Sequence, residues 1–448
     1  MGRLLNIWRS WSVRRRRLTV VGVLVALCAA GGLIAYLSLK RPGDVLNEDA
    51  EFVPPKHQRH QKPETTNWPI YGYDRERTRY LPANDVKPPF AERLWKFDAG
   101  RLLEFSPILV RGDLYVMDKA AVMYSLRAKT GRVNWKRQIG SLNASAPAYY
   151  KHRLFASTLE PGEIVAMNAD NGRVLWRHPL PGRTETSPLV YQHKVLVGCE
   201  CGDVMALDPK TGQTRWTVHT AGAVKGGVAV HDGVAFIGNY AGQLFAIRVA
   251  DGSVKWQTDS LGSSFGRSGR FYSTPAVAYG RVYAGNIDGR VYSFVEDTGQ
   301  LAWSHSTGAE VYAGPAVADT PGAPPTVFIG SADHNFYALD AKSGALRWQH
   351  TVGSAVLGAA SVVGRIVYVG VIGDNIGTFG YDTGSGDEVF HSPYGEYNPV
   401  ISDSHLLYLT GSSKILALEP VSRKEKRKEA RRQAARERKQ RHRHNKGK

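Results

Sequence analysis

The feature that most constrains the fold of this chain is a motif that recurs about every 40 residues. Each full copy contains an apolar run, a glycine in a short polar turn, and an aromatic residue four positions after that glycine. An isolated copy of the last part alone precedes the first full copy. The aromatic positions are Trp95, Trp135, Trp176, Trp216, Trp256, Trp303, Trp348 and Phe390, at spacings of 40, 41, 40, 40, 47, 45 and 42 residues. This period is typical of a four-stranded propeller blade.

The residues inside each copy have the pattern of strands. In one copy, residues 194–198 and 204–208 are short apolar runs, and Thr211 and Gly212 follow where a tight hairpin needs a positive φ. Residues 90–420 show no convincing helical period. The sequence therefore predicts an all-β domain.

The two ends of this region are incomplete, and each supplies what the other lacks. Trp95 has a closing strand but no inner strands, whereas residues 397–420 supply inner strands but no closing strand. We expect strand 93–97 to complete the blade that residues 397–420 begin. The prediction is an eight-bladed β-propeller closed by an N-terminal strand, an arrangement that leaves only short sheet edges.

The eight aromatic residues of the motif are expected to dock neighbouring blades. One large ring at a fixed place after a turn, repeated in each copy, is typical of packing rather than of a cofactor pocket. We therefore assign these residues a structural role.

The formal net charge of +18 is concentrated at the two ends of the chain. Residues 1–17 contribute +6 and residues 423–448 contribute +11, which leaves about +1 for everything between them. A nucleic-acid-binding body would need a basic face, so no nucleic acid is expected as a partner. Residues 421–448 are expected to form a disordered basic tail, and residues 423–448 are the segment that would bind an anionic surface.

A membrane segment is expected near the N-terminus. Residues 19–39 carry no charge and are long enough to cross a hydrocarbon core as a helix. Six arginines precede them and only Lys40 and Arg41 follow closely, so the positive-inside rule places residues 1–18 in the cytoplasm. The expected domains are this basic N-terminus, a transmembrane helix or signal anchor at 19–39, a Pro-rich spacer at 40–66 and the propeller at 67–420, outside the cytoplasm.

Three other interpretations fit the N-terminal segment less well than an anchor. A cleaved signal peptide usually has an apolar region of only ~7–15 residues. A lipoprotein signal would place its lipid on Cys28, but Leu27 is a poor residue before a lipidated cysteine. The arginine run is similar to a twin-arginine signal but lacks the rest of that motif.

The repeat resembles that of the quinoprotein dehydrogenases and their non-catalytic relatives. The form A-x-D-x-x-T-G-x-x-x-W is best seen in residues 206–216 and 338–348, and the resemblance spans residues 68–420. Residues 67–74 (NWPIYGYD), followed by Arg77, Thr78, Arg79 and Tyr80, are similar to the lead-in of that family.

The resemblance implies a fold but leaves the activity open. Enzymes of the family carry pyrroloquinoline quinone (PQQ) over a bound Ca²⁺, beside a catalytic Asp and a disulfide between adjacent cysteines. This chain has no adjacent cysteines, and most of its repeats stay at 40–42 residues without the insertions of the enzymes. We expect a non-catalytic scaffold member, with no catalytic, cofactor-binding or metal-binding residues.

Two features stand out from the repeat. Cys199 and Cys201 flank one residue in a predicted hairpin turn, and a disulfide, a metal site with two further ligands, or two unpaired turn residues are all compatible with this spacing. Residues 261–272 form the longest insertion, in a connection between blades. Its aromatic and arginine side chains are of the kind enriched at interfaces, or the insertion is an ordinary Gly/Ser-rich loop. The partner-binding candidates are Phe265, Arg267, Arg270, Phe271 and Tyr272.

The sequence as a whole favours a scaffold in the cell envelope. It predicts a single-pass membrane protein whose extracytoplasmic propeller holds an envelope protein or an anionic polymer. The alternatives are a PQQ-dependent oxidoreductase, which would need PQQ with calcium, and the sensor module of a signalling system, which would need a separate signalling partner.

Overall fold

The computed structural model describes residues 12–39, 42–55, 68–82, 86–90, 93–262, 269–374 and 376–421. The chain divides into two compact units, which are residues 1–43 with 261–268, and residues 44–260 with 269–448. The first unit contains helix α2 (Val13–Leu39). No helix among the described residues combines the length and the apolar character needed to cross a membrane. The span expected over residues 19–39 therefore stays a prediction.

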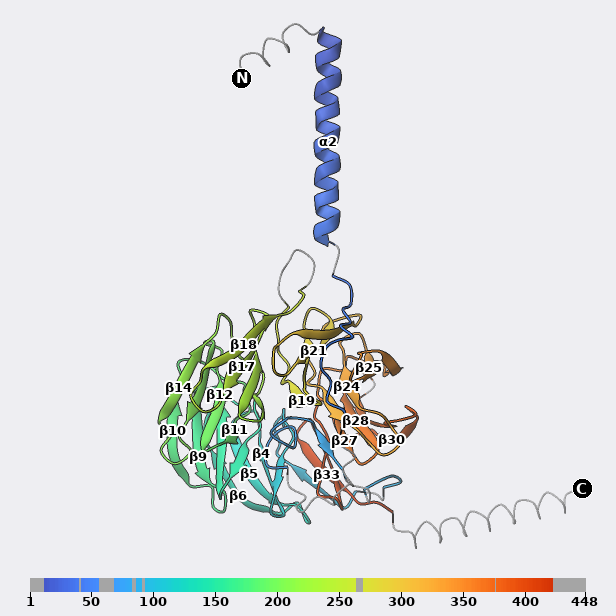
Figure 1. Cartoon of the computed structure of the whole chain (residues 1–448). Coiled ribbons are helices and arrows are strands. Elements are labelled where there is room, and N and C mark those ends of the chain that lie inside the picture. The colour runs from blue at the N-terminus through green and yellow to red at the C-terminus, as the bar shows by residue number, and fades with distance from the viewer. Residues whose placement is uncertain are drawn as a thin grey trace, which may run out of the picture. The chain divides into compact units, whose positions relative to one another are not determined.

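The second unit is the eight-bladed β-propeller that the repeat predicts (Figure 1). Its strands form eight sheets, in which strands consecutive in sequence pair as antiparallel neighbours. Two sheets also include a strand from before the first blade: β2 (Trp95–Asp98), which is antiparallel to its neighbour, and β1 (Tyr80–Leu81), which is parallel to its neighbour. No helix lies between residues 90 and 420 in the described part of the chain, as expected. Inner strands of successive blades contact one another, for example β3 (Ile108–Val110) with β7 (Ala148–Tyr150).

The blades are numbered 1 to 8 in chain order, and each is given below from its inner to its outer strand. Blades 1 and 2 consist of β3 (Ile108–Val110), β4 (Asp113–Met117), β5 (Val122–Arg127) and β6 (Val133–Gln138), then β7 (Ala148–Tyr150), β8 (Arg153–Thr158), β9 (Glu163–Asn168) and β10 (Val174–Pro179). Blades 3 and 4 consist of β11 (Leu189–Tyr191), β12 (Lys194–Gly198), β13 (Asp203–Leu207) and β14 (Thr214–His219), then β15 (Ala229–His231), β16 (Val234–Gly238), β17 (Gln243–Arg248) and β18 (Val254–Asp259). Blades 5 and 6 consist of β19 (Ala276–Ala278), β20 (Arg281–Asn286), β21 (Arg290–Val295) and β22 (Leu301–Ser306), then β23 (Ala316–Ala318), β24 (Thr326–Gly330), β25 (Asn335–Asp340) and β26 (Leu346–Thr351). Blade 7 consists of β27 (Ser361–Val363), β28 (Ile366–Val371), β29 (Gly377–Asp382) and β30 (Glu388–Ser392), with β1 (Tyr80–Leu81) parallel to β27. Blade 8 consists of β31 (Ile401–Ser402), β32 (Leu407–Gly411), β33 (Lys414–Leu418) and β2 (Trp95–Asp98).

Blade 8 closes the ring as the sequence predicted. β2 pairs antiparallel with β33, with Trp95 opposite Ala417 and Asp98 opposite Lys414. The Ser413 hydroxyl also donates a hydrogen bond of 2.6 Å to the Asp98 carboxylate. A strand from the start of the domain thus becomes the outer strand of its last blade, and the closure is non-covalent.

The glycine and the tryptophan of the motif contact each other across the junction between blades wherever the motif has a tryptophan. The Trp176 indole N–H donates to the Pro209 carbonyl of the next blade at 3.2 Å. Gly212 of that blade has φ +76°, and a Cβ there would lie 2.7 Å from the Trp176 ring. The position therefore favours glycine because of both its backbone conformation and the ring above it. Each tryptophan from Trp95 to Trp348 donates in this way to the following blade.

Phe390 replaces the tryptophan at the one junction where this arrangement has no counterpart. The outer strand of blade 8 comes from the N-terminal side of the chain, so no hairpin turn joins it to β33. Residues 86–90 lie there instead: Phe90 pairs with Pro420, and the Phe90 and Phe390 rings are 5.3 Å apart. A phenylalanine needs no carbonyl acceptor for an indole N–H.

Residues before the first blade cover two parts of the ring. Residues 44–52 lie along β22, where Leu46 pairs with Trp303 and the Asn47 N–H donates to the Ala302 carbonyl at 2.8 Å. Trp303 is fully buried as a result, whereas Trp216 at the same position of blade 3 is only partly buried.

Residues 68–82 cross the inner strands at the axis of the ring. Carbonyls of this segment accept backbone N–H groups from Val230, Val277, Val317 and Val362, in blades 4, 5, 6 and 7. The side chains of Arg77 and Arg79 are fully buried among carbonyl groups. Arg77 donates to carbonyls of Ser187 and Val228, and Arg79 donates to carbonyls of Thr274 and Pro315. The segment therefore links blades 4 to 7, which follow it in the chain only after three other blades.

Candidate functional site

The connections between successive blades converge on the axis at one end of the ring. They enclose a small cavity of about 50 Å³, whose inner wall includes Tyr71 and Arg79. Each blade contributes to the lining, because the same connection recurs in each repeat. We call this region the axial mouth and define it by Glu104, Glu185, Glu200, Lys225, Tyr240, Arg270, Tyr272, Tyr312 and Tyr397.

A lysine between two carboxylates forms the charged centre of the axial mouth. Lys225 Nζ lies 2.6 Å from Glu185 Oε1 and 2.9 Å from Glu200 Oε1. Burial alone would lower the pKa of Lys225, but the hydrogen bonds that its ammonium donates to both carboxylates outweigh this effect and raise that pKa. Burial raises the pKa of Glu200, but the Lys225 ammonium outweighs this effect and holds that pKa below its usual range. Lys225 and Glu200 are therefore charged at neutral pH.

Tyrosine rings surround this charged centre. The Tyr272 hydroxyl donates to Glu185 Oε2 at 3.2 Å, and its ring lies 6.2 Å from Tyr240 and 5.8 Å from Tyr312. The Arg270 guanidinium lies over the Tyr240 ring at 5.3 Å, and the Lys225 ammonium lies 5.6 Å from the same ring. Cations over aromatic faces are held by the ring quadrupole. The result is a partly exposed surface of aromatic and charged groups.

The structure separates the five partner-binding candidates predicted from the sequence. Arg270 and Tyr272 lie at the axial mouth. Phe271 is a correction, because its side chain is fully buried and packs against Tyr292 and Phe294, so it offers no surface to a partner. Phe265 and Arg267 lie outside the described residues.

Sequence reasoning missed Glu185, Glu200 and Lys225. Glu185 and Lys225 are 40 residues apart, which is one repeat, and so they occupy equivalent connections of neighbouring blades. An opposite pair of charges at one repeat spacing was the available signal. Glu200 gave no such signal, because its contact with Lys225 depends on the shape of the turn that carries it.

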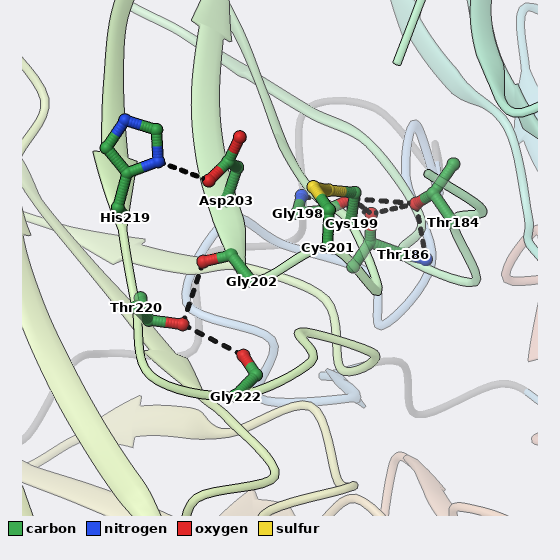
Figure 2. Close-up of a disulfide and its surroundings, with 10 residues drawn as sticks. All are labelled: Thr184, Thr186, Gly198, Cys199, Cys201, Gly202, Asp203, His219, Thr220 and Gly222. Atoms are coloured by element: carbon green, nitrogen blue, oxygen red, sulfur yellow. Dashed lines mark hydrogen bonds and ion pairs between the residues drawn. A yellow bond between two sulfur atoms is a disulfide. The ribbon is translucent and has the colours of Figure 1, made fainter. Parts of the chain in front are cut away.

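The turn that carries Glu200 contains a disulfide, which Figure 2 shows with its surroundings. Cys199 and Cys201 are joined in the turn between β12 and β13, with Cα atoms 5.2 Å apart. Cys199 is fully buried, whereas Cys201 is exposed. Asp203 follows at the start of β13, and its Oδ1 lies 2.6 Å from His219 Nδ1. The pairing that the sequence left open is therefore a disulfide.

Two larger cavities lie away from the axial mouth. One of about 1410 Å³ lies at the seam of blades 7 and 8 and is lined by Phe90, Phe390 and Leu418. The other, of about 790 Å³, is lined by carboxylates including Asp74, Glu296 and Asp319. We call the second the acidic cavity. Burial raises the pKa of its Asp74 carboxyl to about 6, even though the Thr78 hydrogen bonds act in the other direction.

The axial mouth does not fit the cofactor that the resemblance to quinoprotein dehydrogenases implies. Pockets for cofactors and other small molecules are ~300–1,000 Å³ in volume, whereas the axial cavity is about 50 Å³. Among the residues the structure describes, Cys199, Cys201 and Asp203 form the one group close enough to share a metal ion. Its sulfurs are bonded to each other, and it is not the oxygen-rich set that Ca²⁺ requires.

Comparison with known proteins places the propeller among PQQ-repeat proteins. A family model described as outer membrane protein assembly factor BamB matches residues 85–223 and 202–429. The chain is similar to the structure of BamB from Moraxella catarrhalis, with 15% identity, a TM-score of 0.62, and coverage of 74% of this chain and 100% of that one. It is also similar to the quinohemoprotein alcohol dehydrogenase ADHIIG from Pseudomonas putida HK5, with 13% identity, a TM-score of 0.68, and coverage of 79% and 80%. At such identities the likeness concerns the fold alone.

One curated relative matches over a short stretch. The 1-butanol dehydrogenase (cytochrome c) of Thauera butanivorans is 34% identical over 73 residues. The match covers 15% of this chain and 11% of that protein, so the chain spans about a tenth of the length of the relative.

Proposed function

This chain belongs to the PQQ-repeat propeller family whose model is described as outer membrane protein assembly factor BamB, and from that membership we propose that it is a binding scaffold. The proposed scaffold is anchored in the cell membrane, displays the propeller outside the cytoplasm, and holds an envelope protein or polymer at the axial mouth. The observation that carries the proposal is the cluster of tyrosine rings around the Lys225 ion pairs.

The composition of the axial mouth supports binding of a macromolecule. Tyrosine and arginine are enriched among the residues that contribute most to interface affinity. Tyr240, Tyr272 and Arg270 supply both kinds of side chain at one place, and they are partly or fully exposed. The ion pairs hold Glu185 and Glu200 in place before a partner arrives, which lowers the entropy lost on binding.

The size of the axial cavity supports a scaffold over a PQQ-dependent oxidoreductase. A cavity of about 50 Å³ has no room for a quinone of three fused rings. The proposed scaffold therefore acts without a cofactor. Full-length protein mixed with PQQ and Ca²⁺ and then desalted should keep none of the absorbance of the quinone, whereas retained absorbance would favour the oxidoreductase.

The anchoring part of the proposal rests on the sequence of residues 1–41. Its uncharged stretch at 19–39 and the arginines before it support a single crossing with the propeller outside. Protease added to intact cells or spheroplasts should digest the propeller. A propeller protected from that protease would contradict the proposed location.

A photo-cross-linking amino acid tests the binding surface in native membranes. In the full-length protein it replaces Tyr240, at the axial mouth, or Tyr150, which lies at the opposite end of its blade before the turn between β7 and β8. A partner should be captured from the Tyr240 position and not from the Tyr150 position. Capture of the same species at equal yield from both positions would contradict the proposed surface.

A further inference from the structure

The Cys199–Cys201 disulfide replaces a hydrogen-bonded cap that other blades use in the same turn. In blade 4 the first turn residue is Asn239, one repeat after Cys199, and its N–H bonds to the Gln243 carbonyl at 2.9 Å, as that of Cys199 does to Asp203. Asn239 Oδ1 accepts the N–H groups of Ala241 and Gln243. Side-chain oxygens of the first turn residue also cap blades 1, 5 and 6, from Asp118, Asn286 and Ser331. The fold thus builds this turn without a disulfide.

The disulfide also encloses too short a loop to add much stability. The entropy that a cross-link removes from the unfolded chain grows with the length of the loop, and here one residue, Glu200, lies between the cysteines. A bond that replaces an adequate cap and stabilises the fold little calls for a chemical role.

The two sulfurs differ in their access to solvent. Cys199 is fully buried in the core cluster that contains Val197 and Met205. Cys201 is exposed and lies where Gly182 of the preceding connection lets the chain approach closely, since a Cβ at Gly182 would be 3.3 Å from that of Cys201. An incoming thiolate therefore reaches the sulfur of Cys201 and not that of Cys199.

The turn lies next to the axial mouth, where a bound polypeptide would be held. Glu200, between the two cysteines, forms an ion pair with Lys225, and its N–H bonds to the Arg183 carbonyl at 2.8 Å. These contacts fix the peptide between the sulfurs at the rim of the mouth. If the axial mouth binds a polypeptide as proposed above, the Cys199–Cys201 disulfide lies next to that polypeptide.

We propose that the Cys199–Cys201 disulfide is a thiol–disulfide exchange site whose substrate is a dithiol of a polypeptide. A thiolate of the substrate attacks Cys201 Sγ, so that a bond from the substrate to Cys201 forms and the Cys199–Cys201 bond breaks. The electron pair leaves on Cys199 Sγ, which takes a proton from water. The second substrate thiolate then attacks its own sulfur in the mixed disulfide and releases Cys201 as a thiolate, which is also protonated. The substrate is oxidised to a disulfide by two electrons, and the cysteine pair is reduced by two.

The experiment uses the full-length protein in a Cys28→Ser background, so that no other cysteine is present. The probe is a synthetic reduced peptide with two cysteines separated by two residues. After acid quenching and alkylation, mass spectrometry should show one peptide disulfide formed for each Cys199–Cys201 pair alkylated. Mixed disulfides trapped at short times should map to Cys201. A disulfide that stays intact in excess peptide, or adducts that map to Cys199, would overturn the proposal.

Two matched variants test the direction of attack. Cys199→Ser leaves the exposed sulfur and Cys201→Ser leaves the buried one, and each is mixed with the oxidised form of the same peptide. The Cys199→Ser protein should form the mixed disulfide at least about tenfold faster, because exposure controls access to the sulfur. Equal rates in two variants with the same thermal unfolding midpoint would contradict the assignment. The mapping on the unsubstituted pair decides the question even if a variant does not fold.

Discussion

At the scale of single residues, the tryptophan of the motif contributes differently to the free energy of unfolding in different blades. Trp303 is fully buried under residues 44–52, whereas Trp216 is partly exposed. Both donate an indole N–H to a carbonyl of the next blade, with a donor–acceptor distance of 3.0 Å. Trp303→Ala should lower the free energy of unfolding by about 3–5 kcal/mol. Trp216→Ala should cost less, because less of its ring leaves water on folding. Chemical denaturation of the two variants measures both values, and an equal or larger loss for Trp216→Ala would contradict the role given to residues 44–52.

Asp74 in the acidic cavity predicts a pH dependence of stability. Its pKa is raised from 3.8 to about 6 in the folded chain, chiefly by burial. The folded state therefore binds the proton more tightly, so stability is greatest below about pH 4 for this group and is lost as the pH rises to about 6. A difference of this size corresponds to about 2–3 kcal/mol. Asp74→Asn should remove this part of the pH dependence, as measured by denaturation between pH 4.5 and 7. A constant difference between the two proteins over that range would show that Asp74 does not titrate as described.

Residue-level function was the part that the sequence predicted least well. Arg270 and Tyr272 were identified by their types within an insertion, but Phe271 between them faces the core. An insertion does not show the period of a strand, so nothing in the sequence distinguishes the side that faces inward. Glu200 and Lys225 meet only because a turn within blade 3 lies against the connection between blades 3 and 4.

At the scale of elements, closure by β2 is the feature with the sharpest consequence. Deleting residues 93–98 leaves β33 with an unpaired apolar edge, which favours aggregation. Deleting residues 44–52 is the control, because it uncovers β22 but leaves each blade its four strands. The first deletion should abolish the soluble monomer, and the second should lower only the unfolding midpoint. Size-exclusion chromatography and thermal denaturation separate these outcomes. A monomeric, cooperatively folding protein without residues 93–98 would contradict ring closure by this strand.

Most strands, and the closing strand, were predictable because the repeat fixes their order and their turns. Gly212 and its equivalents marked the outer hairpins, and the structure adds the reason, which is the ring of the preceding tryptophan above each glycine. The substitution at Phe390 was visible in the sequence without its cause. That cause is the missing hairpin of blade 8, which follows from the closure and not from any local pattern. The covering of β22 by residues 44–52 has no sequence signal, because these residues lack a strand pattern.

At the scale of the whole molecule, residues 68–82 hold the inner strands of several blades together. Arg79 is fully buried and bonds to the carbonyls of Thr274 and Pro315, in successive connections. Arg79→Ala should lower the free energy of unfolding by at least about 3 kcal/mol, because it leaves these buried carbonyls without donors. Arg75→Ala in the same segment should cost less than about 1 kcal/mol, because the side chain of Arg75 is exposed and its ion pair with Glu76 is solvated. Equal losses would show that the segment does not act through the buried arginines.

The pairing of β2 with β33 also determines when the ring can close during synthesis of the chain. Asp98 and Ser413, which meet at that join, are 315 residues apart in the chain. At ~5–20 residues per second, the ribosome completes the partner of β2 roughly 15–60 seconds after β2 itself. During that interval β2 of the nascent chain has no pairing strand. A chain that stops before residue 414 never forms this pair. Ring closure therefore has to wait until β33 has been synthesised, however early the first seven blades form.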